Sequence, residues 1–143
     1  MKLIKITILI FLIFIFLIFS FFSCFFPSNL ITIDLKKQLV KSCNCSGIYY
    51  LEIEDEDMYD EYWIKFMNSE NSPPTCLSLF SIPKDYDIYK GTMKVNRIKL
   101  RPCTRYRITR SQGDASGATI HVITDEHGKV AICESDEINC NLK

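Results

Sequence analysis

Six cysteines beyond the apolar N-terminal stretch are the residues best able to do chemistry in this chain. They are Cys43, Cys45, Cys76, Cys103, Cys133 and Cys140. An even number of cysteines in an oxidising compartment is typical of a disulfide framework. Cys43 and Cys45 are one residue apart, so in extended chain their side chains point to opposite faces and a bridge between them would be strained. We therefore expect three bridges, with Cys43 and Cys45 joined to different partners.

The same thiols, together with His121 and His127, are also candidate zinc ligands. The chain has no Cys-x-x-Cys pair, and the spacing of His121, His127 and Cys133 matches no common ligand pattern. The acidic run Glu52–Glu61 has no calcium-binding loop with a closing glutamate. We expect neither a metal nor a cofactor.

Basic residues between Lys84 and Arg110 are the candidate binding site. Alternation in two expected strands places five cations on one sheet face. They are Arg97, Lys99, Arg101, Arg105 and Arg107. Such a face can attract an anionic polymer, lipid headgroups or a protein, without specific nucleic-acid recognition. Alternatively, the face meets the acidic run Glu52–Glu61 and the charges satisfy each other, which the zero formal net charge favours.

A catalytic reading finds little support. The loop Gly113–Gly117 contains Ser116, but Ala115 separates it from Asp114, and a triad also needs a base and an orienting acid on a larger scaffold. We interpret this loop as a turn and expect no catalytic residues and no enzyme activity.

The apolar stretch Ile6–Phe26, preceded by Lys2 and Lys5, determines where this chemistry takes place. A basic start followed by a long apolar run is typical of a secretory signal, and the lysines keep the N-terminus cytoplasmic. The chain beyond it is therefore expected outside, with 15 Lys and Arg against 17 Asp and Glu. About 20 apolar residues can also span a membrane as an uncleaved anchor.

Phe21-Phe22-Ser23-Cys24 resembles a bacterial lipobox, in which cleavage before the cysteine leaves its thiol to carry lipid. Ser23 suits the position before the cut, whereas Phe21 departs from the usual Leu. The resemblance implies a lipoprotein held in the membrane through Cys24. An ordinary cut near Pro27, which yields a secreted protein, and a retained anchor are the alternatives.

Cys43-Asn44-Cys45, at the start of a six-cysteine exported domain, faintly resembles netrin-like modules, which include tissue metalloproteinase inhibitors. Those modules begin with the Cys-x-Cys itself, whereas here some sixteen exported residues precede it. The likeness is an analogy, and it implies an alternative function as a secreted inhibitor or regulator of an extracellular enzyme.

The elements expected around these residues form one domain. Residues 1–26 are the signal peptide or anchor, 27–33 a tether, and 34–143 a single extracytoplasmic domain. Apolar residues at helical spacing predict a main helix over about 57–68, and we expect its aromatic stripe to pack in the core, with a ligand platform as the alternative. Asp34 could cap a short helix through Lys41. Strands are expected over the ranges 47–53, 75–82, 86–90, 95–101, 104–110, 119–124 and 129–133.

The sequence therefore predicts an α+β fold: a mainly antiparallel sheet of about five to six strands, one main helix and a disulfide-stapled small domain. The predicted function is that of a non-enzymatic exported binding module, lipid-anchored or secreted, which recognises an anionic partner through the basic face.

Overall fold

The computed structural model describes residues 30–43, 46–57, 59–112 and 115–134. These residues form ten β-strands and no helix. The strands are β1 (Ile31–Asp34), β2 (Leu39–Ser42), β3 (Tyr50–Asp55), β4 (Glu61–Phe66), β5 (Cys76–Ser78), β6 (Tyr86–Lys90), β7 (Met93–Val95), β8 (Arg105–Gln112), β9 (Ala115–Thr124) and β10 (Val130–Glu134).

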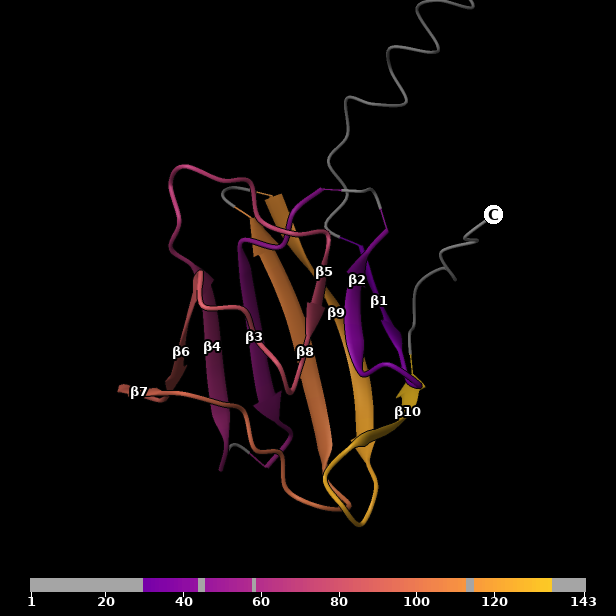
Figure 1. The fold of residues 1–143 in the computed structure, drawn as a ribbon. Coiled ribbons are helices and arrows are strands. Elements are labelled where there is room, and N and C mark those ends of the chain that lie inside the picture. Colours follow the sequence, from indigo (N-terminus) through magenta and orange to yellow (C-terminus); the bar gives the residue numbers. More distant parts are fainter. Residues whose placement is uncertain (1–29, 44–45, 58, 113–114, 135–143) are drawn as a thin grey trace, which may run out of the picture.

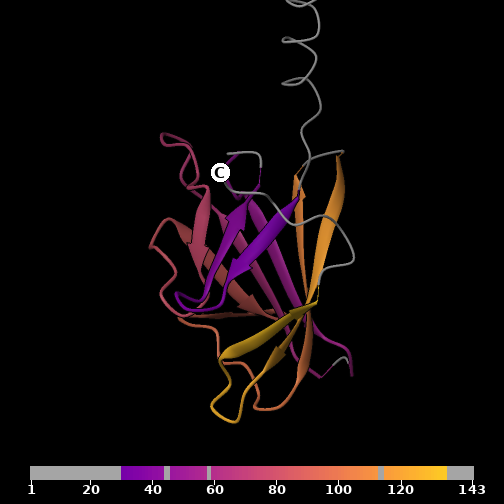
Figure 2. The same ribbon diagram turned by 90° about the vertical axis from the view of Figure 1, so that its right-hand side faces the viewer.

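The strands form two antiparallel sheets. The smaller sheet has the order β1-β2-β5, and the larger has the order β10-β9-β8-β3-β4-β6-β7. The three-stranded sheet lies over the β8–β9 side of the seven-stranded sheet, near β10, and β6 and β7 lie at the opposite end (Figure 1). A view turned by 90° shows the two layers from the side (Figure 2).

Alternating side chains explain why these segments are strands that pack in two layers. In β4, Tyr62, Ile64 and Phe66 are buried, and the residues between them face outward. β3 repeats the pattern, with Leu51 and Ile53 fully buried. A period of two places every second side chain on the same face of a sheet. Each large side chain buried in this way contributes about 1.5–3 kcal/mol to folding.

Both sheets supply the hydrophobic core. Val40 and Leu77 come from the smaller sheet, and Ile108 and Val122 come from the larger one, all without exposed surface. Twenty apolar side chains form this cluster. The core therefore packs the two layers against each other.

Polar side chains add specific links between the layers. The amide of Gln38, in the β1–β2 turn, donates to the carbonyl of Val130 at 2.8 Å and accepts from its N–H at 2.8 Å. The buried guanidinium of Arg110, on β8, donates to Ser42 Oγ at 2.9 Å and to the Gly47 carbonyl at 3.0 Å. These bonds fix how the smaller sheet sits on the larger.

The β9–β10 turn confirms the hairpin that the sequence predicts around residues 125–128. Asp125 Oδ1 accepts N–H groups from His127 at 2.8 Å and Lys129 at 2.9 Å. Gly128 has φ +76°, and a Cβ there would lie 2.5 Å from the carbonyl oxygen of Leu100. Only glycine meets both demands without strain.

The predicted α+β class is wrong, because the segment expected as the main helix is strand β4. Tyr62 and Phe66 are four apart, and this spacing fits a helix face and a strand face equally well. Ile64 lies between them and is also buried, which completes a period of two. The β-branched and aromatic residues of this segment are typical of strands.

Two smaller predictions also fail. Asp34 does not begin a helix: its carboxylate accepts the Lys37 N–H at 3.1 Å within the turn that joins β1 to β2. Residues 95–101 do not form a strand, since β7 ends at Val95 and the chain then runs irregularly to β8.

β1 begins at Ile31, inside the range expected to be a tether. β6 has its predicted bounds.

The predicted disulfide framework is not formed by the described cysteines. Cys76, Cys103 and Cys133 are free thiols on separate elements, and no disulfide joins two described residues. Cys43 is disulfide-bonded. Cys45 and Cys140 lie outside the described residues. With Cys76, Cys103 and Cys133 free, the six cysteines do not form the three predicted bridges.

The leader lies outside the described residues, and so does Cys24. Export and lipid attachment therefore stay predictions. Within the described part, no helix has the length and apolar character needed to cross a membrane.

Candidate functional site

The outer face of the seven-stranded sheet carries most of the functional side chains. We use this name for the side turned away from the three-stranded sheet. Its residues alternate with the core residues along each strand, so they are exposed or half-buried. Charged residues occupy the part formed by β3, β8 and β9, and aromatic residues occupy the part formed by β3, β4 and β6.

The charged part is internally paired. Arg107 bonds Glu54, which lies directly across on β3. Arg105 bonds Glu134 and lies 3.0 Å from Glu56. His121 Nδ1 is 3.2 Å from the same Glu56 carboxylate. Exposed pairs such as these contribute little to stability, but they neutralise the potential of the cations.

The five cations predicted to share one face are divided among three places. Arg105 and Arg107 lie on the outer face of β8. Arg97 and Lys99 lie in the segment between β7 and β8, beside Phe80 and Ile98 at a depression of about 290 Å³. Arg101 lies further along this segment and pairs with acids of the β3–β4 turn. The continuous basic face is therefore absent from the described structure.

Arg101 belongs to a compact charged cluster at the end of β3. The Asp55 side chain is fully buried, bonds Arg101, and accepts N–H groups from Tyr59 at 2.9 Å and Asp60 at 3.1 Å. Arg101 also lies 5.3 Å from the centre of the Tyr59 ring. This arrangement closes the β3–β4 turn, so we assign it a structural role.

Nothing in the described residues is built as a metal centre. No group of three or more His, Cys, Asp or Glu side chains in that part of the chain is arranged to hold an ion. Glu54, Asp55, Glu56 and His121 do share a small depression of about 180 Å³ with Arg107. Their charges are already satisfied by the arginine pairs described above.

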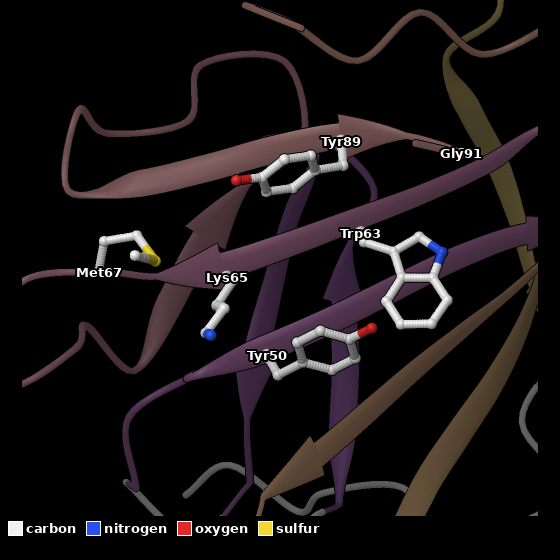
Figure 3. Close-up of a pocket in the computed structure, with 6 residues that line it drawn as sticks. All are labelled: Tyr50, Trp63, Lys65, Met67, Tyr89 and Gly91. Carbon is white, nitrogen blue, oxygen red and sulfur yellow. The ribbon is translucent and has the colours of Figure 1, made fainter. Parts of the chain in front are cut away.

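The aromatic part forms a depression of about 300 Å³ on the outer face. Its lining comes from three neighbouring strands and the turn after β6 (Figure 3). The lining residues are Tyr50, Trp63, Lys65, Met67, Tyr89 and Gly91. We call this site the aromatic depression.

Strand register sets the relative positions of the rings. Trp63 on β4 lies directly opposite Tyr89 on β6, and Lys65 lies opposite Tyr50 on β3. The rings of Tyr50 and Trp63 meet edge to face, with their centres 5.7 Å apart and their planes at 79°. Trp63 keeps 40% of its surface exposed and Met67 keeps 54%. Figure 3 shows the Lys65 side chain between the rings of Tyr50 and Tyr89.

Tyr50 brings an unusual hydroxyl group to this site. The oxygen is enclosed and has no hydrogen-bond partner among the described residues. Burial and, to a smaller extent, the carboxylates of Glu52 and Glu61 together raise the pKa of Tyr50 to about 12. The phenol is therefore protonated at neutral pH and remains a hydrogen-bond donor.

Glu52 and Glu61 border the depression on its acidic side. Glu52 lies opposite Trp63, and Glu61 precedes Trp63 by two residues on the same face of β4. Burial raises the pKa of Glu52, and its neighbours Glu54 and Glu61 raise it as well, while Arg107 lowers it. Lys65 makes no ion pair within the described residues, because Asp87 across from it bonds Lys94 at 2.6 Å.

Sequence reasoning misses this site because it assigns the whole aromatic stripe to the core of a helix. On a strand the same residues divide between two faces: Tyr62 and Phe66 face the core, and Trp63 and Met67 face solvent. Alternation of Trp63, Lys65 and Met67 with three apolar residues is the signal that would have revealed it.

No protein-family model, curated protein or solved structure matches this chain. The geometry of the described residues is therefore the basis for inferring its function.

Proposed function

We propose that the chain is an exported, non-enzymatic binding module whose recognition site is the aromatic depression. The leader Ile6–Phe26 supports export to the outer side of a membrane, as a lipid-anchored or a secreted protein. The observation that carries the binding role is the exposed ring of Trp63 between Tyr50 and Tyr89 on a strongly charged sheet face.

Trp63 is exposed beside two half-buried tyrosines, and an exposed patch that contains large aromatic side chains often marks a binding site. Tryptophan and tyrosine are enriched at the centres of binding sites, where they bury a large apolar area with little loss of side-chain freedom. The residues around Trp63 include a lysine and a thioether, but no nucleophile paired with a base. This chemistry favours recognition over catalysis.

An anionic partner remains a second candidate, at a different place from the predicted basic face. Arg97 and Lys99 form no ion pair within the described residues, and they flank an apolar surface of Phe80 and Ile98. Two cations supply a weaker field than five, so this candidate has less support than the aromatic depression. The inhibitor alternative depends on residues 43–45, of which only Cys43 is described.

The proposal can be tested through Trp63, which is the only tryptophan of the chain. Its emission and its quenching by acrylamide are measured with neutral oligosaccharides, a heparin-like polymer, anionic vesicles and apolar peptides. We expect at least one class to shield Trp63, and its binding measured by calorimetry to be lost in Trp63→Ala.

Phe80→Ala is the matched control, because Phe80 is 39% exposed but lines a separate depression. It should leave binding unchanged. The proposal is overturned if none of the four classes shields Trp63, or if binding survives in Trp63→Ala.

A further inference from the structure

The arrangement of the three rings indicates what kind of group they receive. Tyr50, Trp63 and Tyr89 come from three adjacent strands, so they lie side by side along the sheet. Trp63 is 40% exposed and is supported edge to face by Tyr50, so its ring offers a face on which a flat apolar surface can pack. The C–H face of a pyranose sugar is such a surface.

Polar groups around the aromatic depression both donate and accept hydrogen bonds. The Lys65 ammonium lines the depression and donates, while the carboxylates of Glu52 and Glu61 accept. A sugar hydroxyl does both, so a ring with several hydroxyls can satisfy the two sides together. A lipid chain or an apolar peptide side chain does neither and would cover these charged groups without giving them partners, which is costly.

The charges argue for a ligand without net charge. Glu52 and Glu61 repel a polyanion. The negative charge of these two carboxylates also helps to raise the pKa of Tyr50. Lys65 lies within the lining and repels a cationic ligand. Asp87 and Lys94 neutralise each other at 2.6 Å.

We propose that the aromatic depression binds a neutral hexopyranose glycan, with one sugar ring stacked on Trp63. The inference rests on the proposed function and names its ligand class. The volume of about 300 Å³ is at the small end of ligand sites, so the depression takes one or two sugar rings. The Lys65 ammonium donates to a ring or hydroxyl oxygen, and the carboxylate of Glu52 accepts from a sugar hydroxyl.

The test uses the full chain as it is exported and processed. Neutral hexasaccharides of glucose, mannose and N-acetylglucosamine are titrated, with binding followed by Trp63 emission and by calorimetry. At least one of the three should shift the emission of Trp63. Trp63→Ala should weaken its binding about tenfold or more, and Trp63→Tyr, which keeps a ring, should weaken it less.

Two further variants separate stacking from hydrogen bonding. Lys65→Met should weaken glycan binding several-fold while the protein unfolds at an almost unchanged temperature, because Lys65 lines the depression and makes no ion pair within the described residues. Phe80→Ala should bind as the unaltered chain does. Equal affinity of Lys65→Met and the unaltered protein would overturn the assigned hydrogen bond.

The outcomes for the two proposals can be told apart. If only a heparin-like polymer or an apolar peptide shields Trp63, and Trp63→Ala abolishes that binding, the depression is a binding site but the glycan inference is wrong. If neither glycans nor any other class shields Trp63, both proposals are wrong.

Discussion

Asp55 is a charged residue with no exposed side-chain surface, and its partners explain how this is possible. Burial raises the pKa of Asp55, but the N–H groups of Tyr59 and Asp60 and the guanidinium of Arg101 outweigh it and hold the pKa below its ordinary value. A carboxylate with a lowered pKa stabilises the fold above its unfolded-state pKa of about 3.9, and this stability is lost as the pH falls through the folded pKa.

The first prediction follows from this residue. Asp55→Asn should lower the free energy of unfolding by about 2 kcal/mol at pH 7, since the pair with Arg101 is lost while Arg101 itself stays partly solvated. Urea unfolding at pH 7 and at pH 3 should show a smaller pH dependence in the variant. Asp57→Asn, on an exposed residue of the same turn, is the control. An unchanged pH dependence in Asp55→Asn would contradict the assignment.

At the scale of elements, two hairpin turns require glycine for different reasons. Gly91 in the β6–β7 turn has φ +56°, and nothing lies within 4 Å of a Cβ placed there. Gly128 in the β9–β10 turn has φ +76° and faces the Leu100 carbonyl. A side chain at either position would therefore strain the backbone, but only at position 128 would its Cβ also clash with a neighbour.

The second prediction compares these two turns. Gly91→Ala should lower the free energy of unfolding by about 1 kcal/mol, from backbone strain alone. Gly128→Ala should lower it by about 3 kcal/mol, because the segment from Leu100 must also move. Denaturant unfolding of both variants measures the difference. Equal losses would show that the β9–β10 turn can shift away from Leu100 without cost.

The third prediction concerns the segment between β7 and β8. Any binding of a heparin-like polymer at low salt should come from Arg97 and Lys99, and it should fall steeply as salt is added. Replacing both with Gln should remove this binding, whereas Arg107→Gln should leave it unchanged, because Arg107 is already paired with Glu54. Affinity chromatography at two salt concentrations measures this, and equal losses in both variants would restore a common basic face.

The contrast between β4 and β8 shows which elements the sequence could predict. Strand β8 alternates Arg105, Tyr106, Arg107 and Ile108, so its period of two is clear, and the strand is predicted within one or two residues of its bounds. Strand β4 places bulky residues on both faces, so its period is ambiguous until the position of the core is known. The aromatic depression could not be predicted for the same reason, because a helical interpretation of this segment places its outward-facing rings in the core.

The sequence does not predict which distant strands pair with each other. Arg107 and Glu54 are opposite each other only because β3 lies beside β8, and no local pattern sets this neighbour. The sequence suggests that the acidic run Glu52–Glu61 can pair with these cations. Which arginines are neutralised depends on the strand order, which the sequence does not reveal.

For the whole molecule, location is the property on which the proposed function depends. The apolar leader favours export, and Cys24 at its end is the predicted point of lipid attachment. An exported binding module that keeps a lipid should partition with membranes as a complete folded domain.

The fourth prediction tests this location. Cys24→Ser should release the domain from the membrane fraction or block its processing, since serine has no thiol to carry lipid. Cell fractionation and intact mass of the purified protein measure both effects. A substituted chain that stays in the membrane with residues 1–26 attached would replace the lipoprotein interpretation by that of a retained anchor.

The early start of β1 limits how far a membrane-held form can reach. Only five residue steps separate Phe26, at the end of the leader, from Ile31 in the core. A fully extended chain covers about 3.3–3.6 Å per residue, so this connection is at most about 18 Å long. If the leader is retained as an anchor, we expect the domain to stay in a thin layer above the bilayer, where it meets only molecules of that surface. A weak affinity for a ligand on that same surface would then suffice for binding, because the ligand is present there at high local concentration.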